Sequence, residues 1–150
     1  MATTGGGIRF DIENQLSVAQ VFPGAATVTQ NSYMKASGAQ DLTIGRRVSM
    51  VIFPLVAPTG NITAEVIEAT DGLLTTSVSS LASVTVLAAA AAVGYPIIVP
   101  LPQGASAGKQ YIGGRIATSA GTLTCDIYLM PDDEIPHKFK GFPKVNEAVV

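Results

Sequence analysis

Charged residues are scarce in this sequence of 150 residues. Asp, Glu, Lys and Arg together make up 13% of the chain, against about 25% in a typical soluble domain. The net charge is −2, so the chain has no positive field with which to attract nucleic acid. A surface so poor in charge is expected to have apolar areas that a partner covers. The alternative is a monomer with a surface of Ser, Thr, Ala and Gly.

Cysteine and histidine occur once each, and tryptophan is absent. The single Cys125 excludes an intrachain disulfide, and a single histidine, His137, leaves no paired ligands for zinc. The start of the chain lacks the basic and apolar regions of a signal peptide. The longest apolar run, Val84 to Val93, is too short to span a bilayer. We therefore expect a soluble chain made in the cytoplasm, with no membrane partner and no cofactor.

Helical periodicity is nearly absent, whereas Thr, Val and Ile are frequent and Gly and Pro interrupt the chain at short intervals. This pattern predicts an all-β sandwich or barrel. We expect residues 1–7 to form a flexible leader and residues 8–130 to form the β-sandwich domain. Residues 8–22 are apolar without a clear period, which favours an extended N-terminal arm over a helix at 11–21. Residues 131–150 are expected to form a C-terminal extension, or second arm.

Two segments predict specific places in a sheet. Residues 48–56 are apolar at both parities, so this strand is expected to be covered on both faces. In the segment 95–101 and just after it, Pro96, Pro100 and Pro102 share one parity. Their missing N–H groups all lie along one edge, which predicts a sheet-edge strand that proline protects from unwanted pairing.

The clearest hairpin joins residues 109–118 to residues 122–130 through Ser119-Ala120-Gly121, where glycine can adopt positive φ. The second of these strands alternates cleanly between apolar and polar residues. Shorter strands are expected at 28–34, 62–69 and 83–87. The inner faces of the sandwich are predicted to hold Val48, Met50, Ile52, Val66, Ile97, Val99, Ile112, Ile116, Leu123, Ile127 and Leu129.

Four segments occur in an order that resembles a known family: Leu16 to Gln20, Asp41 to Gly45, Gly94 to Pro102, and the hairpin from Tyr111 to Leu129. Their order resembles that of the small jelly-roll cement (decoration) proteins of tailed-phage capsids. The resemblance implies a jelly-roll-like sandwich that forms homotrimers and binds the major capsid protein on the outside of the virion. It implies no catalytic residue. Residues 131–150 are longer than the family leads us to expect.

Three motifs could carry chemistry. Residues 104–108 match G-x-S-x-G around Ser106, but a nucleophile elbow needs a strand before the serine and a helix after it, and here a β-like run follows. Cys125 lies on the apolar face of its strand, which favours a buried, unreactive thiol. Asp132, Asp133 and Glu134 lack the spacing of a calcium loop and favour a solvated turn.

The sequence thus predicts a structural virion protein, not an enzyme, that stabilises a phage capsid from outside. One alternative is a receptor- or carbohydrate-binding head domain of a phage fibre or tail, which the absence of tryptophan and the low aromatic content of 6% disfavour. The other is an esterase built on Ser106. Extended arms reach far without a core of their own, and Arg46-Arg47 could meet an acidic partner surface. The candidate residues for the capsid or subunit interface are Phe10, Leu16, Val21, Phe22, Arg46, Arg47, Phe139 and Phe142.

Overall fold

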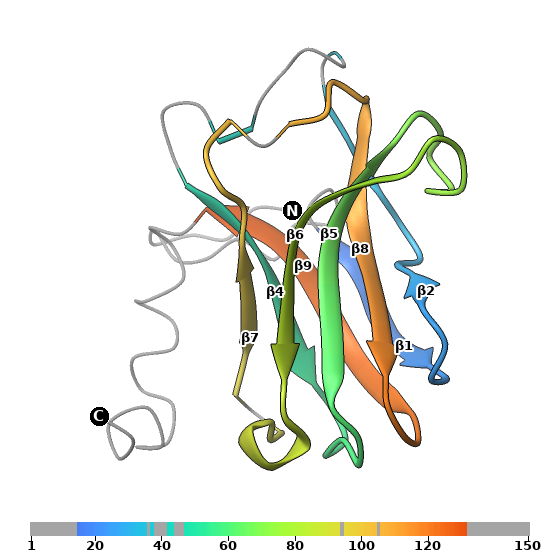
Figure 1. Cartoon of the computed structure of the whole chain (residues 1–150), viewed down its shortest axis with the longest axis vertical. Coiled ribbons are helices and arrows are strands. Elements are labelled where there is room, and N and C mark those ends of the chain that lie inside the picture. The colour runs from blue at the N-terminus through green and yellow to red at the C-terminus, as the bar shows by residue number, and fades with distance from the viewer. Residues whose placement is uncertain are drawn as a thin grey trace.

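The chain folds into two antiparallel β-sheets that pack face to face, as the computed structural model in Figure 1 shows. The structure describes residues 15–35, 37, 42–43, 47–93, 95–104 and 106–131. Within these residues the only helical element is a short 3₁₀ turn at Ala88–Ala90. No described helix is long and apolar enough to cross a bilayer. The prediction of an all-β sandwich is confirmed.

The first sheet has the order β1-β9-β4-β7, and its strands are β1 (Gln15–Phe22), β9 (Leu123–Pro131), β4 (Val48–Pro54) and β7 (Ile97–Pro100). The second sheet has the order β2-β8-β5-β6, with β3 also paired to β8. Its strands are β2 (Thr27–Val28), β8 (Tyr111–Thr118), β5 (Ile62–Ala69), β6 (Ser79–Val86) and β3 (Tyr33–Met34).

The strand pairs are nested along the chain. The first strand pairs with the last, β2 and β3 pair with β8, β4 pairs with β7, and β5 pairs with β6. Such pairs arise when the chain forms one long antiparallel hairpin and this hairpin rolls up. Each arm of the hairpin then contributes strands to both sheets. Segments far apart in the sequence therefore lie side by side at both ends of the sandwich (Figure 1).

The core lies between the two sheets and contains every residue predicted for it. All eleven predicted side chains, from Val48 to Leu129, belong to one buried cluster. Cys125 belongs to the same cluster and is fully buried. The alternation of apolar and polar residues in the sequence was sufficient here because each strand of a sandwich has one inner face.

Strand β4 is buried on both faces, as its double apolar pattern predicts, but it ends at Pro54. Leu55 and Val56, the last residues of the predicted segment 48–56, are exposed. Met50 and Ile52 point into the main core, whereas Val51 on the outer face is also fully buried. Val51 packs with Met130, Phe53 and Tyr128 in a separate apolar cluster. The rings of Phe53 and Tyr128 meet edge to face, with centroids 6.0 Å apart, a geometry that aromatic quadrupoles favour.

Strand β7 is an edge strand, as predicted. It occupies the end of its sheet, and among the described strands it pairs only with β4. The N–H of Leu101 donates to the carbonyl of Val48 at 3.0 Å. Residues of the parity of Leu101 therefore turn their N–H groups towards β4, and Pro96, Pro100 and Pro102 turn the opposite way. The prolines leave the outer edge of β7 without donors at these positions.

Part of the predicted N-terminal arm is a strand of the sandwich. Residues 15–22 form β1, which pairs with β9, and both Leu16 and Phe22 lie in the core. Their irregular apolar spacing reflects shifts of register between Gln15 and Gln20, which change the face that successive residues present. The predicted strand at 28–34 is instead two short strands, β2 and β3, and β6 starts at Ser79, earlier than predicted.

Candidate functional site

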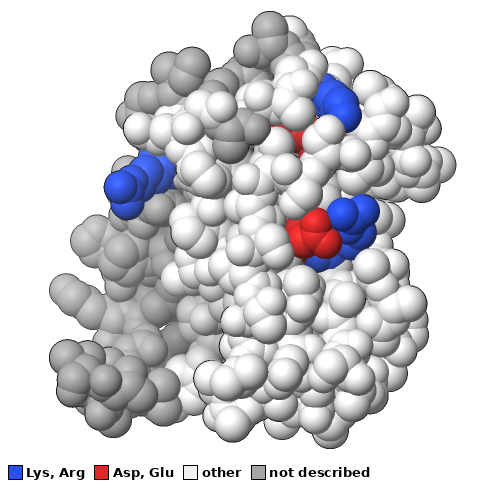
Figure 2. Space-filling view, in the orientation of Figure 1, with Lys and Arg blue, Asp and Glu red and all other residues white. Residues whose placement is uncertain are grey.

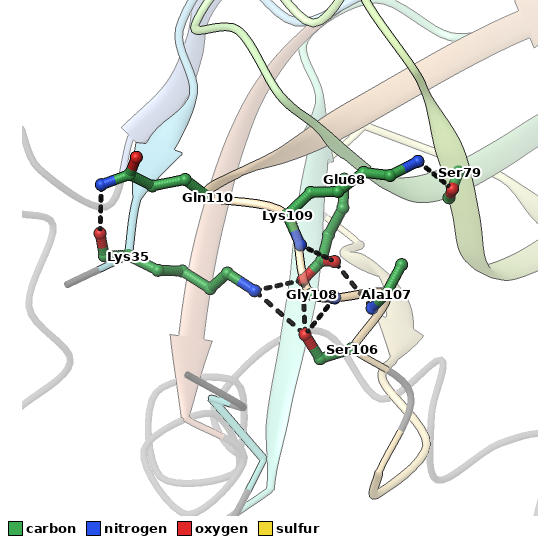
Figure 3. A network of polar contacts seen from close by, with 8 residues as sticks. All are labelled: Lys35, Glu68, Ser79, Ser106, Ala107, Gly108, Lys109 and Gln110. Carbon is green, nitrogen blue, oxygen red and sulfur yellow. Dashed lines mark hydrogen bonds and ion pairs between the residues drawn. The ribbon is translucent and has the colours of Figure 1, made fainter. Parts of the chain in front are cut away.

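A buried ion pair lies at one end of the sandwich. Lys35 follows β3, Glu68 is in β5, and the lysine Nζ lies 2.5 Å from Glu68 Oε2. Both side chains are only 1% exposed. Ser106, in the loop before β8, joins the pair, since its Oγ lies 3.0 Å from both Lys35 Nζ and Glu68 Oε2 (Figure 3). Three separate segments of the chain meet at these charges.

The Glu68 carboxylate is held from two sides. Its Oε1 accepts hydrogen bonds from the backbone N–H of Ala107 at 2.7 Å and of Lys109 at 3.2 Å. Its Oε2 accepts from Lys35 and Ser106. A buried carboxylate needs such partners because removal from water is costly. Glu68 thereby ties the loop at 106–109 to the sheet.

The hydroxyl of Ser106 is engaged as a structural group. It accepts from Lys35 Nζ and from the N–H of Gly108, and it donates to Glu68. The loop leads into strand β8, not into a helix, so the local structure of a nucleophile elbow is missing around this serine. The residues of the G-x-S-x-G match therefore belong to a loop that folds over Glu68.

The sequence holds a signal for Glu68 that our sequence analysis missed. Ile62, Ala64 and Val66 share the inward parity of β5 and belong to the core. Glu68 continues this parity and is buried. A carboxylate at an inward position requires a buried partner. No comparable signal identifies Lys35 as that partner.

At the opposite end of the sandwich, the loops that the structure describes carry no charge. Residues 23–26, 55–61, 87–93, 95–96 and 119–122 belong to four loops that meet there, and none of these residues is Asp, Glu, Lys or Arg. We call this surface the uncharged loop end. It exposes four large apolar side chains, which are between 42% and 59% exposed: Leu55, Val56, Leu87 and Val93.

Hydrogen bonds join the loops of this end to one another. The N–H of Ser119 donates to the carbonyl of Asn61 at 2.9 Å, and the N–H of Ala88 donates to the side chain of Asn61 at 3.1 Å. The N–H of Thr118 donates to the carbonyl of Gly24 at 2.9 Å. The uncharged loop end is therefore one connected surface built from segments of both sheets.

Charge is distributed unevenly between the two ends. Arg47, Asp71 and Lys109 lie with the buried ion pair at the far end. Glu65 and Arg115 form a partly exposed pair on the outer face of the second sheet. Asp126 lies on β9 opposite Phe53 and accepts a hydrogen bond from the N–H of Ala19 at 2.7 Å. On the face shown in Figure 2, the described atoms in the lower part of the molecule are white, so no described Lys, Arg, Asp or Glu is seen there. The described sandwich is thus polar at one end and uncharged at the other.

Of the residues predicted for an interface, Phe10, Arg46, Phe139 and Phe142 lie outside the described residues. Leu16 and Phe22 are 1% and 0% exposed. These two are core residues and cannot contact a partner while the chain is folded, because the cluster between the sheets encloses them. Val21 is 55% exposed on β1. Arg47 is exposed and lines an open depression of about 340 Å³ with residues 100–103.

The remaining candidate groups show no site for a metal among the residues that the structure describes. Residues 132–134 lie outside that part of the chain. Cys125 is buried, and desolvation, with a further contribution from Asp126, raises the pKa of its thiol to about 12. The prediction of a buried thiol is confirmed.

No model of a known protein family matches the chain. A comparison with curated proteins also gives no significant match.

Proposed function

We propose that this protein is a structural subunit of a virion that binds the outer surface of a tailed-phage capsid and stabilises the capsid lattice. The observation that carries the proposal is the uncharged loop end. The sequence resemblance to capsid cement proteins supports it, and so does the nested strand pairing, which is the pairing that a jelly roll of two Greek keys requires.

An uncharged end is suited to permanent burial against another protein. Charged side chains are depleted at the centres of stable interfaces because their desolvation is costly. Leu55, Val56 and Leu87 have no such cost. Fully burying an exposed Val or Leu side chain contributes about 1.5–3 kcal/mol, and since these three are already about half buried, each can contribute about half of that. We infer that this end faces the capsid and that the end with the buried ion pair faces outward.

Stabilisation of the lattice follows from mass action. A protein that binds only the assembled shell lowers the free energy of that shell by RT ln(1 + [L]/Kd). The homotrimer that the resemblance implies would bind several copies of the major capsid protein at once. Multivalent binding of this kind raises avidity above the affinity of a single contact.

Charge substitution at the uncharged loop end tests the proposal. The variants Val56→Lys and Leu87→Lys are compared with Leu73→Lys, a matched control because Leu73 is 75% exposed but lies in the loop after β5, at the polar end. Binding is measured by co-sedimentation with capsids that lack the protein. We expect the first two variants to bind at least tenfold more weakly, since each brings an unpaired charge into the interface. The control should bind like the wild type.

Equal binding by all four proteins would contradict the proposed orientation. No binding of the wild type to such capsids would contradict the function itself. In that case a screen against glycans would test the alternative, a receptor- or carbohydrate-binding head domain.

A further inference from the structure

The open edges of the two sheets differ in how well they are protected. Among the described strands, β1 and β7 end the first sheet, while β6 ends the second opposite β2 and β3. Strand β7 carries prolines on its outer edge. Strand β1 is irregular, with Ala19 at φ 45° and two shifts of register. Strands β2 and β3 have two residues each. Proline, irregularity and short length are devices that prevent edge-to-edge pairing.

Strand β6 has much less protection. It is eight residues long and contains no proline, no glycine and no charged residue. A single bulge lies near Leu81, where the register against β5 shifts. Beyond the bulge, residues 82–86 pair regularly with residues 62–66 of β5. No described strand pairs with the outer edge of this regular segment, so the N–H and C=O groups of that edge have no strand partner among the described residues.

The side chains around β6 favour contact with another uncharged strand. Ser83 and Thr85 are exposed, and no residue of β6 is fully buried by its own chain. The strand lies within residues 72–108, which contain no charged residue at all. Exposed lysines at an edge would repel a second copy of the same edge, and β6 has none.

We propose that β6 is a self-association site, at which residues 82–86 pair antiparallel with the same residues of a second copy of this chain. A strand paired antiparallel with itself creates a two-fold axis, so each copy offers and receives the same groups. The second sheets of the two copies then form one continuous sheet across the axis, as in other cases of strand addition. An uncharged edge is complementary to itself, which a charged edge is not.

This contact is distinct from a three-fold contact. Because the paired strands run antiparallel, the two copies point their uncharged loop ends in opposite directions. Only one copy of a pair can therefore turn that end towards a given capsid. A two-fold contact cannot close a trimer by itself. Alone it gives a dimer of about 31 kDa, twice the chain mass of 15.4 kDa. Together with a three-fold contact through another surface it gives a hexamer with both kinds of axis. Loss of the β6 contact halves the mass in either case.

The test compares Thr85→Lys with Thr122→Lys. Both threonines are exposed, but Thr122 lies in the turn between β8 and β9. Light scattering on the full chain should show an even number of copies for the wild type and for Thr122→Lys, and half that mass for Thr85→Lys. A wild-type monomer or trimer, or a mass that Thr85→Lys leaves unchanged, would overturn the proposal.

Cross-linking tests the register without a change of charge. The only native thiol, Cys125, is buried, so an introduced cysteine is the one accessible thiol. In this register residue 83 of one copy opposes residue 85 of the other, and opposed residues of paired strands lie about 5 Å apart at Cβ. A mixture of Ser83→Cys and Thr85→Cys should therefore form a disulfide-linked dimer on mild oxidation, and more readily than either variant alone. Thr122→Cys should stay unlinked. Absence of linkage in the β6 variants and their mixture would contradict the antiparallel pairing, whatever the capsid-binding assay gives.

Discussion

Lys35 Nζ lies 2.5 Å from Glu68 Oε2, and both side chains are buried. The two residues belong to segments 33 positions apart in the sequence, and their contact also holds the loop that contains Ser106. The pair thus holds together three segments at the polar end of the sandwich. Removing it should destabilise the packing of that end before the rest of the fold.

Removing one member of the pair should be strongly destabilising. Lys35→Met and Glu68→Gln each leave a buried group without its charged partner, and we expect each to lower the free energy of unfolding by about 3–5 kcal/mol. The double variant Lys35→Met/Glu68→Gln should cost less than the sum of the two single variants, because it leaves no unpaired charge. Urea denaturation measures all three. If the free energy of unfolding of the single variants lies within about 1 kcal/mol of the wild-type value, the pair does not stabilise this end.

Stability should fall at acidic pH, in part through Asp71. The side-chain hydrogen bond from Thr75, together with the backbone N–H of Thr76, holds the pKa of the Asp71 carboxyl below its ordinary value of 3.8. Since the folded-state pKa is the lower one, this contribution is present above the unfolded pKa and is lost as the pH falls through the folded value. NMR titration should give a midpoint below 3.8, and Asp71→Asn should flatten the acid limb of the stability curve. A midpoint above 3.8 would contradict the contact.

The thiol of Cys125 should be unreactive in the folded protein. Burial raises its pKa to about 12, so almost no thiolate forms at neutral pH, and reagents cannot reach it. We expect no labelling by a maleimide at pH 7.5 over hours and rapid labelling in 6 M guanidinium chloride. Rapid labelling under native conditions would show that the β9 side of the core opens.

The close packing of two loops at the uncharged loop end should require a glycine at position 60. A Cβ at this position would lie 2.3 Å from the backbone nitrogen of Ala120, so one of the two loops would have to move. Gly60→Ala should cost about 1–3 kcal/mol and should weaken capsid binding if this end faces the capsid. Gly72→Ala is the control, because its Cβ would meet Tyr111 at an ordinary 3.4 Å. Equal stability of the two variants would contradict the close packing of these loops.

Much of the fold was predictable because the strands of a sandwich have one inner and one outer face. The alternation of Leu123, Cys125 and Ile127 was enough to place them in the core. The three prolines around β7 identified an edge, since missing N–H groups are visible in a sequence. Leu16 and Phe22 were misassigned because the irregular register of β1 destroys the alternation on which such predictions depend.

The candidate sites were less accessible to sequence reasoning. Loop residues such as Val56 and Leu87 look alike whether a neighbouring loop covers them or leaves them exposed. Strand β6 shows no sign in the sequence that it lies at an edge, because edge position depends on which strands pair with it.

By itself, the amino-acid sequence determined the fold class, the core side chains, the protected edge at β7 and the scarcity of charge, because each of these follows from local periodicity or composition. Only the tertiary structure decided that Lys35 meets Glu68, that four uncharged loops form one surface, and that β6 ends its sheet among the described strands. These relationships join residues far apart in the chain, and pairing between distant strands leaves no local pattern from which it could be inferred.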